Sequence, residues 1–273
     1  MASVKPTERP SRIDLIAFDL DGTILEAGEV IPPAAKRTLA EIVKRGLKIA
    51  TATGRSLEDQ VRILKRNGLG SSCGFPHSLI ADEWEIYFLT GSGYKPYTQH
   101  NNMMRRAWAK VLPEVKKIVQ IELQRLSTAG VSVRREVNDD EAARRGTIDL
   151  TFEKVDDAKA EENFLRTVRL CPAELFIHTR NYRHVIFIHS RAGKGNTLKV
   201  LAEYWNIAPS KILCIGDSSN DLSMLDGRHG FLAATISNAD EEVKKAVYTC
   251  GGYIASKPYS KGVVEILQKF VLS

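Results

Sequence analysis

Two acidic residues stand two positions apart at the end of an apolar segment, in the stretch IAFDLDGTIL from Ile16 to Leu25. Asp19 and Asp21 would repel each other there, because neighbouring carboxylates in an apolar setting need compensation to stay charged. A bound cation would supply that compensation. The rest of the chain must then contribute further ligands for it.

Polar residues also follow other apolar segments that have the pattern of strands. The stretches TATGR and GDSSND follow two of them, and AGKG with Lys194 opens the last third of the chain. Ligands of doubly wound sheets bind beyond the carboxyl ends of the strands, so we expect these side chains at one edge of one sheet. Asp19 and Asp21 are therefore predicted to share a cation with Asp217 and Asp221.

The chemistry of these ligands favours magnesium. Carboxylate oxygens are hard ligands, and the chain lacks the His/Cys spacing of a zinc site. Carboxylates with magnesium, a lysine and a hydroxyl suit phosphoryl transfer, in which positioning and charge neutralisation provide most of the catalysis. One carboxylate can also act as a nucleophile and form an aspartyl-phosphate.

The order of the expected elements indicates an α/β protein with an inserted second unit. Residues 12–93 and 184–273 alternate strands with helices, which predicts a Rossmann-like core on a parallel sheet. Residues 94–183 mix strands and helices without alternation, which predicts an α+β cap domain on an antiparallel sheet. Pro113 is expected to break the long helical pattern of this cap in two. Residues 1–11 are expected to form a disordered tail.

Composition excludes several classes of protein. The chain is 43% hydrophobic and 26% charged, as in soluble globular proteins, and has no apolar run long enough to cross a bilayer. Its net charge of +6 comes without a dense Lys/Arg tract, which favours small anionic ligands over nucleic acid. Its N-terminus lacks the apolar core of a signal peptide. Four scattered cysteines without CxxC pairing indicate reduced thiols in a cytoplasmic protein.

The stretches FDLDGT, ATGR, AGKG and GDSSND resemble, in this order, the four motifs of the haloacid dehalogenase-like phosphatases. The resemblance implies that Asp19 is the nucleophile and Asp21 the general acid/base. It implies magnesium ligands at Asp217 and Asp221, beside Asp19 and Asp21. It also implies contacts with the substrate phosphate from Thr53, Gly54, Arg55, Lys194 and Asn220.

The insertion between the second and third motifs resembles the large α+β cap of one subclass. Cof-type sugar phosphatases, sucrose-phosphate phosphatases and eukaryotic phosphomannomutases belong to it. The resemblance implies a magnesium-dependent phosphomonoesterase that hydrolyses a small phosphorylated metabolite, most simply a sugar phosphate. We also expect no nucleic-acid or membrane partner, and a monomer or weak homo-oligomer. The substrate itself cannot be read from the cap, whose residues match no motif.

Each motif alone has a simpler structural explanation. DLDGT can be an Asx turn, GDSSND can cap a helix, and Lys194 can be a solvated charge in a loop. Four such motifs in the family's order make that explanation a poor one for the set. Two functional alternatives stay open: a phosphosugar mutase that returns the phosphate to the sugar, and a non-catalytic binding protein on the same fold. The second should have lost its nucleophile or a metal ligand, and none is missing from the sequence.

Overall fold

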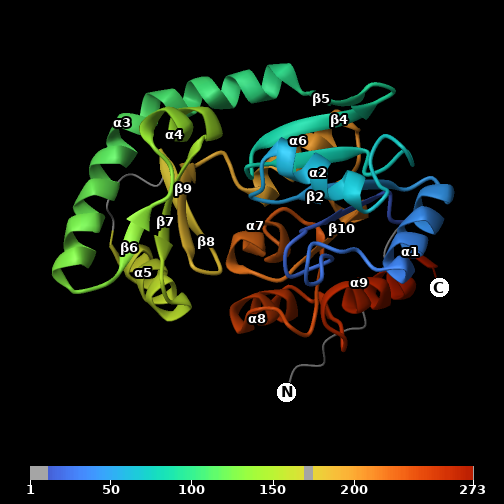
Figure 1. The fold of residues 1–273 in the computed structure, drawn as a ribbon. Helices are drawn as coiled ribbons and strands as arrows, with labels where there is room; N and C mark the ends of the chain where they lie inside the picture. Colours follow the sequence, from blue (N-terminus) through green and yellow to red (C-terminus); the bar gives the residue numbers. More distant parts are fainter. Residues whose placement is uncertain (1–11, 169–174, 273) are drawn as a thin grey trace.

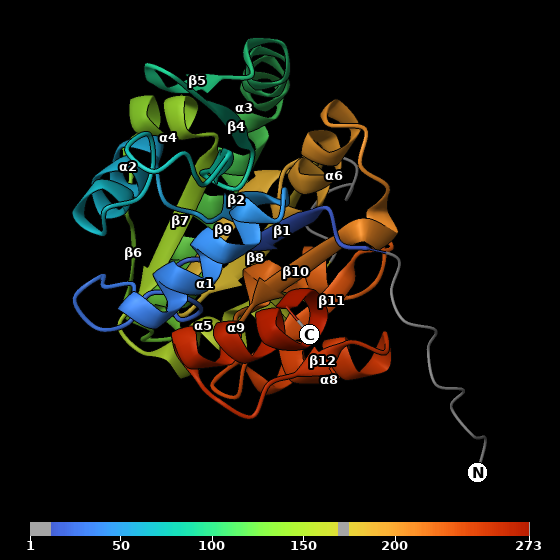
Figure 2. The same ribbon diagram turned by 90° about the vertical axis from the view of Figure 1, so that its right-hand side faces the viewer.

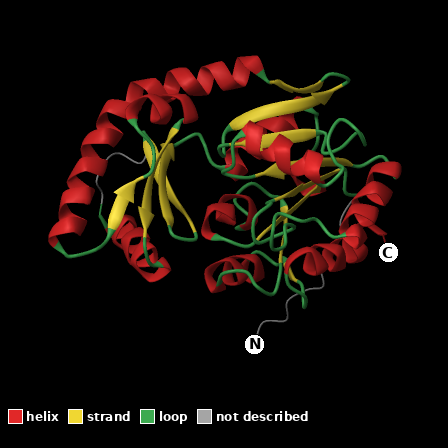
Figure 3. Ribbon diagram, viewed as in Figure 1, coloured by secondary structure: helices red, strands yellow, loops and turns green. Residues whose placement is uncertain are grey.

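The computed structural model describes residues 12–168 and 175–272, and they form two sheets with their helices (Figures 1 and 3). In Figure 1 the green and yellow part of the chain, from α3 to β9, makes a separate unit beside the larger sheet. The tail predicted at residues 1–11 and one of the four cysteines, Cys171, lie outside the described residues.

The larger sheet has eight strands in the order β12-β11-β10-β1-β2-β3-β4-β5. They are β1 (Leu15–Phe18), β2 (Lys48–Ala52), β3 (Ser78–Ala81), β4 (Glu85–Thr90), β5 (Gly93–Pro96), β10 (Ile212–Gly216), β11 (Leu232–Thr235) and β12 (Tyr253–Ile254). Strands β12 to β3 pair in parallel, and β4 and β5 extend the sheet with antiparallel pairs. The predicted α/β class with a mainly parallel sheet is confirmed.

Helices cover both faces of this sheet, because its central strands are apolar on both sides. Ile16 and Phe18 of β1 pack into one apolar cluster, and Leu15 and Ala17 pack into another. One face carries α1 (Pro33–Lys44), α2 (Leu57–Arg66) and α9 (Tyr259–Leu267), and Figure 2 shows α1 and α9 together on it. The other face carries α6 (Lys194–Tyr204), α7 (Leu222–Leu225) and α8 (Glu241–Thr249). Short helical turns lie at η1 (Pro209–Lys211), η2 (Ser219–Asp221) and η3 (Gln268–Leu272).

The smaller sheet has four antiparallel strands in the order β6-β7-β9-β8. Its elements are α3 (Thr98–Thr128), β6 (Val133–Arg135), α4 (Asp139–Arg145), β7 (Thr147–Phe152), α5 (Val155–Thr167), β8 (Phe176–Asn181) and β9 (His184–His189). Trp108 from α3, Phe152 from β7 and Leu165 from α5 belong to one apolar cluster on one face of the sheet. This unit is the α+β insertion that the sequence predicts.

The edges of the inserted unit differ from the prediction at both ends. Strand β9, predicted to lie in the core from residue 184 onward, pairs with β7 and β8 of the smaller sheet. Strand β5, predicted to begin the cap at residue 94, pairs with β4 of the larger sheet. Hairpin pairing explains both differences, because the two strands of a hairpin stay in one sheet. The two sheets therefore divide the chain near residues 97 and 190.

Helix α3 is continuous, so the predicted break at Pro113 is wrong. A proline removes one helical hydrogen bond and strains the preceding turn. Val111 and Val115, on either side of it, are both buried in the core of the smaller unit. Packing of this apolar face stabilises the helix on both sides of the proline, since tertiary contacts outweigh local preference in most protein helices.

Two expectations from composition concern membranes and thiols. Within the described residues, no helix has the length and apolar character needed to cross a bilayer. Cys73, Cys214 and Cys250 are free thiols.

Candidate active site

Neighbouring strands of the larger sheet bring the predicted site residues to one edge. Strand β1 lies between β10 and β2 and runs parallel to both, so their carboxyl ends meet. Asp19 follows β1, Thr53 follows β2, and Asp217 follows β10. Asp221 comes one short turn later, at the end of η2. Residues up to 202 positions apart in the sequence, Asp19 and Asp221, are thus gathered at one place.

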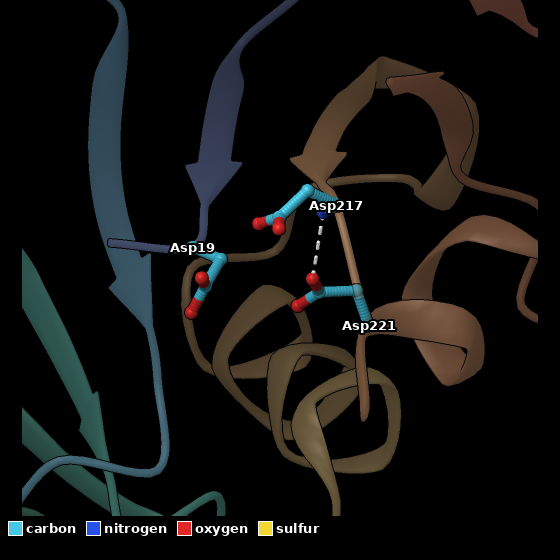
Figure 4. A group of neighbouring side chains, drawn as sticks. All are labelled: Asp19, Asp217 and Asp221. Carbon is cyan, nitrogen blue, oxygen red and sulfur yellow. Dashed lines mark hydrogen bonds between the residues drawn. The ribbon is translucent and has the colours of Figure 1, made fainter. Parts of the chain in front are cut away.

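Three carboxylates form the centre of the site. Asp19, Asp217 and Asp221 each have an oxygen within 4.8 Å of the others, and Figure 4 shows the side chains of Asp217 and Asp221 pointing to the side on which Asp19 lies. Asp221 accepts hydrogen bonds from the backbone N–H groups of Asp217 (2.8 Å) and Ser218 (3.0 Å), which fixes its carboxylate. Asp217 accepts a hydrogen bond of 2.5 Å from the hydroxyl of Thr23.

Burial and the neighbouring carboxylates disfavour the charged forms of Asp19 and Asp217. Burial raises the pKa of Asp19 well above its usual value, although the nearby ammonium of Lys194 opposes this shift. Burial, with the neighbouring carboxylate of Asp221, raises the pKa of Asp217 to about 7. The arrangement therefore stores unfavourable electrostatic energy that a bound cation would relieve.

Lys194 provides part of the missing positive charge. Its Nζ donates to Oδ1 of Asp19 at 2.7 Å and to Oδ1 of Asp221 at 2.6 Å, and the residue is fully buried. Burial alone would lower the pKa of Lys194, but the two carboxylates outweigh it and raise the pKa. The lysine is a fixed ammonium at the centre of the site.

The donor set fits a divalent cation. Three carboxylates and one ammonium leave a formal charge of −2, which a single divalent ion would neutralise. All the available ligand atoms are carboxylate oxygens, which suit magnesium better than a softer metal. The carboxylates that fit a divalent cation here are those of Asp19, Asp217 and Asp221.

Asp21 is not part of that carboxylate cluster, and its role as a further metal ligand stays a prediction. Both of its oxygens accept hydrogen bonds from Arg55, at 2.6 and 2.7 Å. The same guanidinium donates to Glu29 at 3.0 Å. The Asp21 side chain remains 40% exposed at the rim of the site. In this arrangement the Arg55 guanidinium is hydrogen-bonded to two carboxylates, those of Asp21 and Glu29.

The other predicted phosphate contacts divide into two kinds. Thr53 and Gly54 line a cavity that Asp21 and Arg55 also line, and Thr53 itself is 2% exposed. Asn220 is 1% exposed, and both ends of its amide are already used. Its Nδ2 donates to Glu83 at 2.8 Å, and its Oδ1 accepts from Ser218 at 2.7 Å. In this structure the Asn220 side chain therefore supports the loop that carries Asp217 and Asp221.

Two cavities meet the site between the larger and smaller units. One has a volume of about 850 Å³ and the other about 650 Å³, and Asp21 lines both. Asn181 and His184, from the β8–β9 hairpin, also line both cavities. Asp217 lines the smaller one. These volumes lie in the range of small-molecule sites, and the inserted unit forms one wall of each.

Sequence reasoning missed several residues that touch the site from elsewhere. Glu162 of α5 accepts a hydrogen bond of 2.5 Å from the hydroxyl of Ser219, within the loop of Asp217. Buried Arg180 of β8 donates to Glu162 at 2.8 Å and to Asp240 at 2.7 Å. No motif marks these contacts, because they join the cap to the core only after folding. Glu83, the partner of Asn220, is the third missed residue.

A side chain at Gly22 would displace the Asp217 carboxylate from its place in the cluster. The φ of Gly22 is +75°, and a Cβ there would lie 2.4 Å from Oδ2 of Asp217. The Gly22→Ala variant should therefore lose apparent magnesium affinity by at least about tenfold, the range seen when a ligand's support is disturbed. Magnesium-dependent shifts in melting temperature measure this.

The matched control is Gly28→Ala. Gly28 has the same φ of +75°, but nothing lies within 4 Å of its would-be Cβ. It should lose similar stability from backbone strain while keeping its magnesium response. Equal magnesium affinities in the two variants would contradict the assigned contact.

Comparison with known proteins identifies a family and several relatives of this chain. The family model described as haloacid dehalogenase-like hydrolase matches residues 16–75 and 97–267. A protein of Methanoculleus marisnigri named phosphoglycolate phosphatase is 25% identical over 259 residues, which cover 93% of this chain and 95% of that one. A longer protein of Arabidopsis thaliana, named endoribonuclease YBEY, chloroplastic, is 25% identical over 266 residues, covering 88% of this chain but 44% of that one.

Among solved structures, the sucrose-phosphatase of Synechocystis sp. PCC6803, in complex with sucrose and phosphate, has a TM-score of 0.67 at 18% identity. The match covers 95% of this chain and 98% of that one, so the core and the inserted unit share its fold. Because the family model also matches most of the sequence, the chain belongs to the haloacid dehalogenase-like hydrolases.

Proposed function

We propose that this hydrolase is a magnesium-dependent phosphomonoesterase that acts on a small phosphorylated metabolite, in the first instance a sugar phosphate. The observation that carries the proposal is the cluster of Asp19, Asp217 and Asp221 around buried Lys194. The name of the relative from Methanoculleus marisnigri, which matches this chain over almost its whole length, supports a phosphatase. The cavity of about 850 Å³, rich in polar lining residues, supports a small hydroxylated substrate.

Asp19 is the nucleophile in this proposal. Lys194 holds its Oδ1, which leaves the second oxygen to attack phosphorus. The bond from phosphorus to the leaving oxygen breaks, and Asp21 gives that oxygen a proton. Asp21 then takes a proton from water, the water oxygen attacks phosphorus, and the Asp19 carboxylate is released with inorganic phosphate. Magnesium held by Asp19, Asp217 and Asp221 would supply the charge that neutralises the phosphoryl oxygens.

Arg55 controls when Asp21 can act as the general acid/base. Asp21 must leave its paired hydrogen bonds with Arg55 before it can reach a leaving oxygen. A substrate phosphate near Thr53 and Gly54 offers Arg55 an alternative anionic partner of similar geometry, since guanidinium groups bind phosphate and carboxylate alike. Binding of the anion thus frees the acid/base residue.

Product analysis tests the function directly. The protein is incubated with hexose phosphates, pentose phosphates and phosphoglycolate, with magnesium or with EDTA, and both inorganic phosphate and sugar isomers are quantified. We expect phosphate release in magnesium and a loss of at least about 10²-fold in EDTA, because the metal supplies several kcal/mol of charge stabilisation. An isomer without free phosphate would instead establish the mutase. Substrate binding without either product would establish a binding protein.

A further inference from the structure

Glu83 is a buried acid at a position that does not favour it. It sits in the tight turn between β3 and β4, where its φ is +65°, a conformation that residues other than glycine avoid. It is 1% exposed, and burial of a carboxylate is also unfavourable. Such strain is a reason to look for a role at a functional site.

The contacts of Glu83 join the three other segments of the site. Its backbone N–H donates to the carbonyl of Thr53 at 3.1 Å, and its own carbonyl accepts from the hydroxyl of Thr197 at 2.9 Å. Thr197 lies one helical turn after Lys194 on α6. The Oε1 of Glu83 accepts a hydrogen bond from Nδ2 of Asn220 at 2.8 Å. The phosphate-binding loop, the lysine helix and the metal loop all meet this one residue.

A chain of hydrogen bonds runs from Glu83 to the metal ligands. Asn220, fixed by Glu83, accepts from the hydroxyl of Ser218 at 2.7 Å. The backbone N–H of Ser218 donates to Asp221 at 3.0 Å, and that of Asp217 donates to the same oxygen at 2.8 Å. A displaced Asn220 would therefore alter the loop that carries both acids.

The Glu83 carboxylate also takes part in the charge balance of the site. Burial raises the pKa of Glu83 to about 7, against the effects of Lys194 and Asn220. Its Oε2 is buried and has no hydrogen-bond partner among the described residues. Neither the position nor this unpaired oxygen benefits the stability of the fold.

We propose that Glu83 is a positioning residue: through Asn220 and Ser218 it sets the metal-ligating loop relative to Lys194 and Thr53. The inference rests on the proposed function only in taking the carboxylate cluster as a magnesium site, and its metal readout is independent of turnover. It predicts that the fold is more stable without Glu83, while the magnesium site is poorer.

Three variants test this. Glu83→Gly relieves the strained φ and removes the buried acid, so its melting temperature in EDTA should equal or exceed that of the wild type. Its magnesium affinity, taken from metal-dependent melting shifts, should fall by about tenfold or more, as for other supports of metal ligands. Glu83→Gln keeps the Oε1 acceptor for Asn220 and should retain magnesium affinity within about threefold. Asn206→Gly controls for strain relief alone, since exposed Asn206 has a φ of +53° far from the site along α6.

A double-mutant cycle with Asn220→Ala completes the test. Because Glu83 acts through Asn220, Glu83→Gly should add little to the loss of magnesium affinity in Asn220→Ala. Magnesium affinity in Glu83→Gly equal to that of the wild type would overturn the proposal, and so would full additivity in the cycle. A lower melting temperature for Glu83→Gly in EDTA would show that Glu83 stabilises the fold instead. If the wild type binds magnesium but hydrolyses no phosphate ester, the proposed function fails while these metal readouts still judge Glu83.

Discussion

The Asp19→Asn variant should release phosphate at least about 10⁴-fold more slowly than the wild type, the scale of loss found when a nucleophile is removed. A neutral amide cannot attack phosphorus, although it has nearly the same shape. After acid quenching of a reaction with labelled substrate, the wild type should carry protein-bound phosphate and the variant should carry none. Residual activity above about one per cent would remove Asp19 from the nucleophile role.

The fold of Asp19→Asn should remain intact, which separates chemistry from stability. Burial raises the pKa of Asp19, so the folded protein without metal favours the uncharged form at this position. The melting temperature in EDTA should therefore not fall. Asp14→Asn is the matched control: Asp14 lies just before β1 and pairs with Lys211 at 3.1 Å outside the site. It should keep full activity.

The core and the centre of the site could be predicted because their signals are local. The four apolar residues of β1 are all buried, and the acid that follows comes directly at the end of the strand. Strand β10 repeats this pattern and is followed by Asp217, whereas β2 is followed by the hydroxyl residue Thr53. Since parallel strands end at one edge, the order of motifs was sufficient to place Asp19 near Asp217.

The parts that the sequence did not reveal depend on contacts between distant segments. Pro113 looks like a helix breaker, but packing of α3 against the smaller sheet decides the outcome. Asn220 matches a motif, yet its amide is occupied by Glu83, which lies 137 positions earlier and matches none. Asp21 follows Asp19 by two residues, and the sequence did not reveal that its carboxylate pairs with Arg55 at the rim of the site. Spacing specifies which residues meet at an edge, but not which partner each side chain takes.

Lys194→Met should have the largest effect on stability. The lysine is fully buried and is hydrogen-bonded to both Asp19 and Asp221. Methionine fills a similar volume but leaves the carboxylates uncompensated, and loss of one partner from a buried ion pair typically costs about 3 kcal/mol or more. Phosphatase activity should also be lost. Lys199→Met, exposed one turn further along α6, is the matched control and should change neither property.

The pH dependence of this variant identifies the cause. In the metal-free wild type the pKa of Asp217 is raised to about 7, above its value near 4 in the unfolded chain. The folded state therefore binds more protons than the unfolded state between these values, and its stability falls as the pH rises through this window. Without Lys194 the stability should fall more steeply with pH, because the carboxylate cluster then lacks its ammonium partner.

Urea unfolding of Lys194→Met at pH 5 and pH 8, with EDTA or with magnesium, separates charge from packing. The deficit relative to the wild type should be largest at pH 8 in EDTA. It should shrink at pH 5, where Asp217 is protonated, and in magnesium, where a cation restores the charge balance and binding adds stability to the folded state. A deficit that is the same in all four conditions would mean that the lysine stabilises the protein by packing alone. The carboxylate cluster would then not be held together by charge.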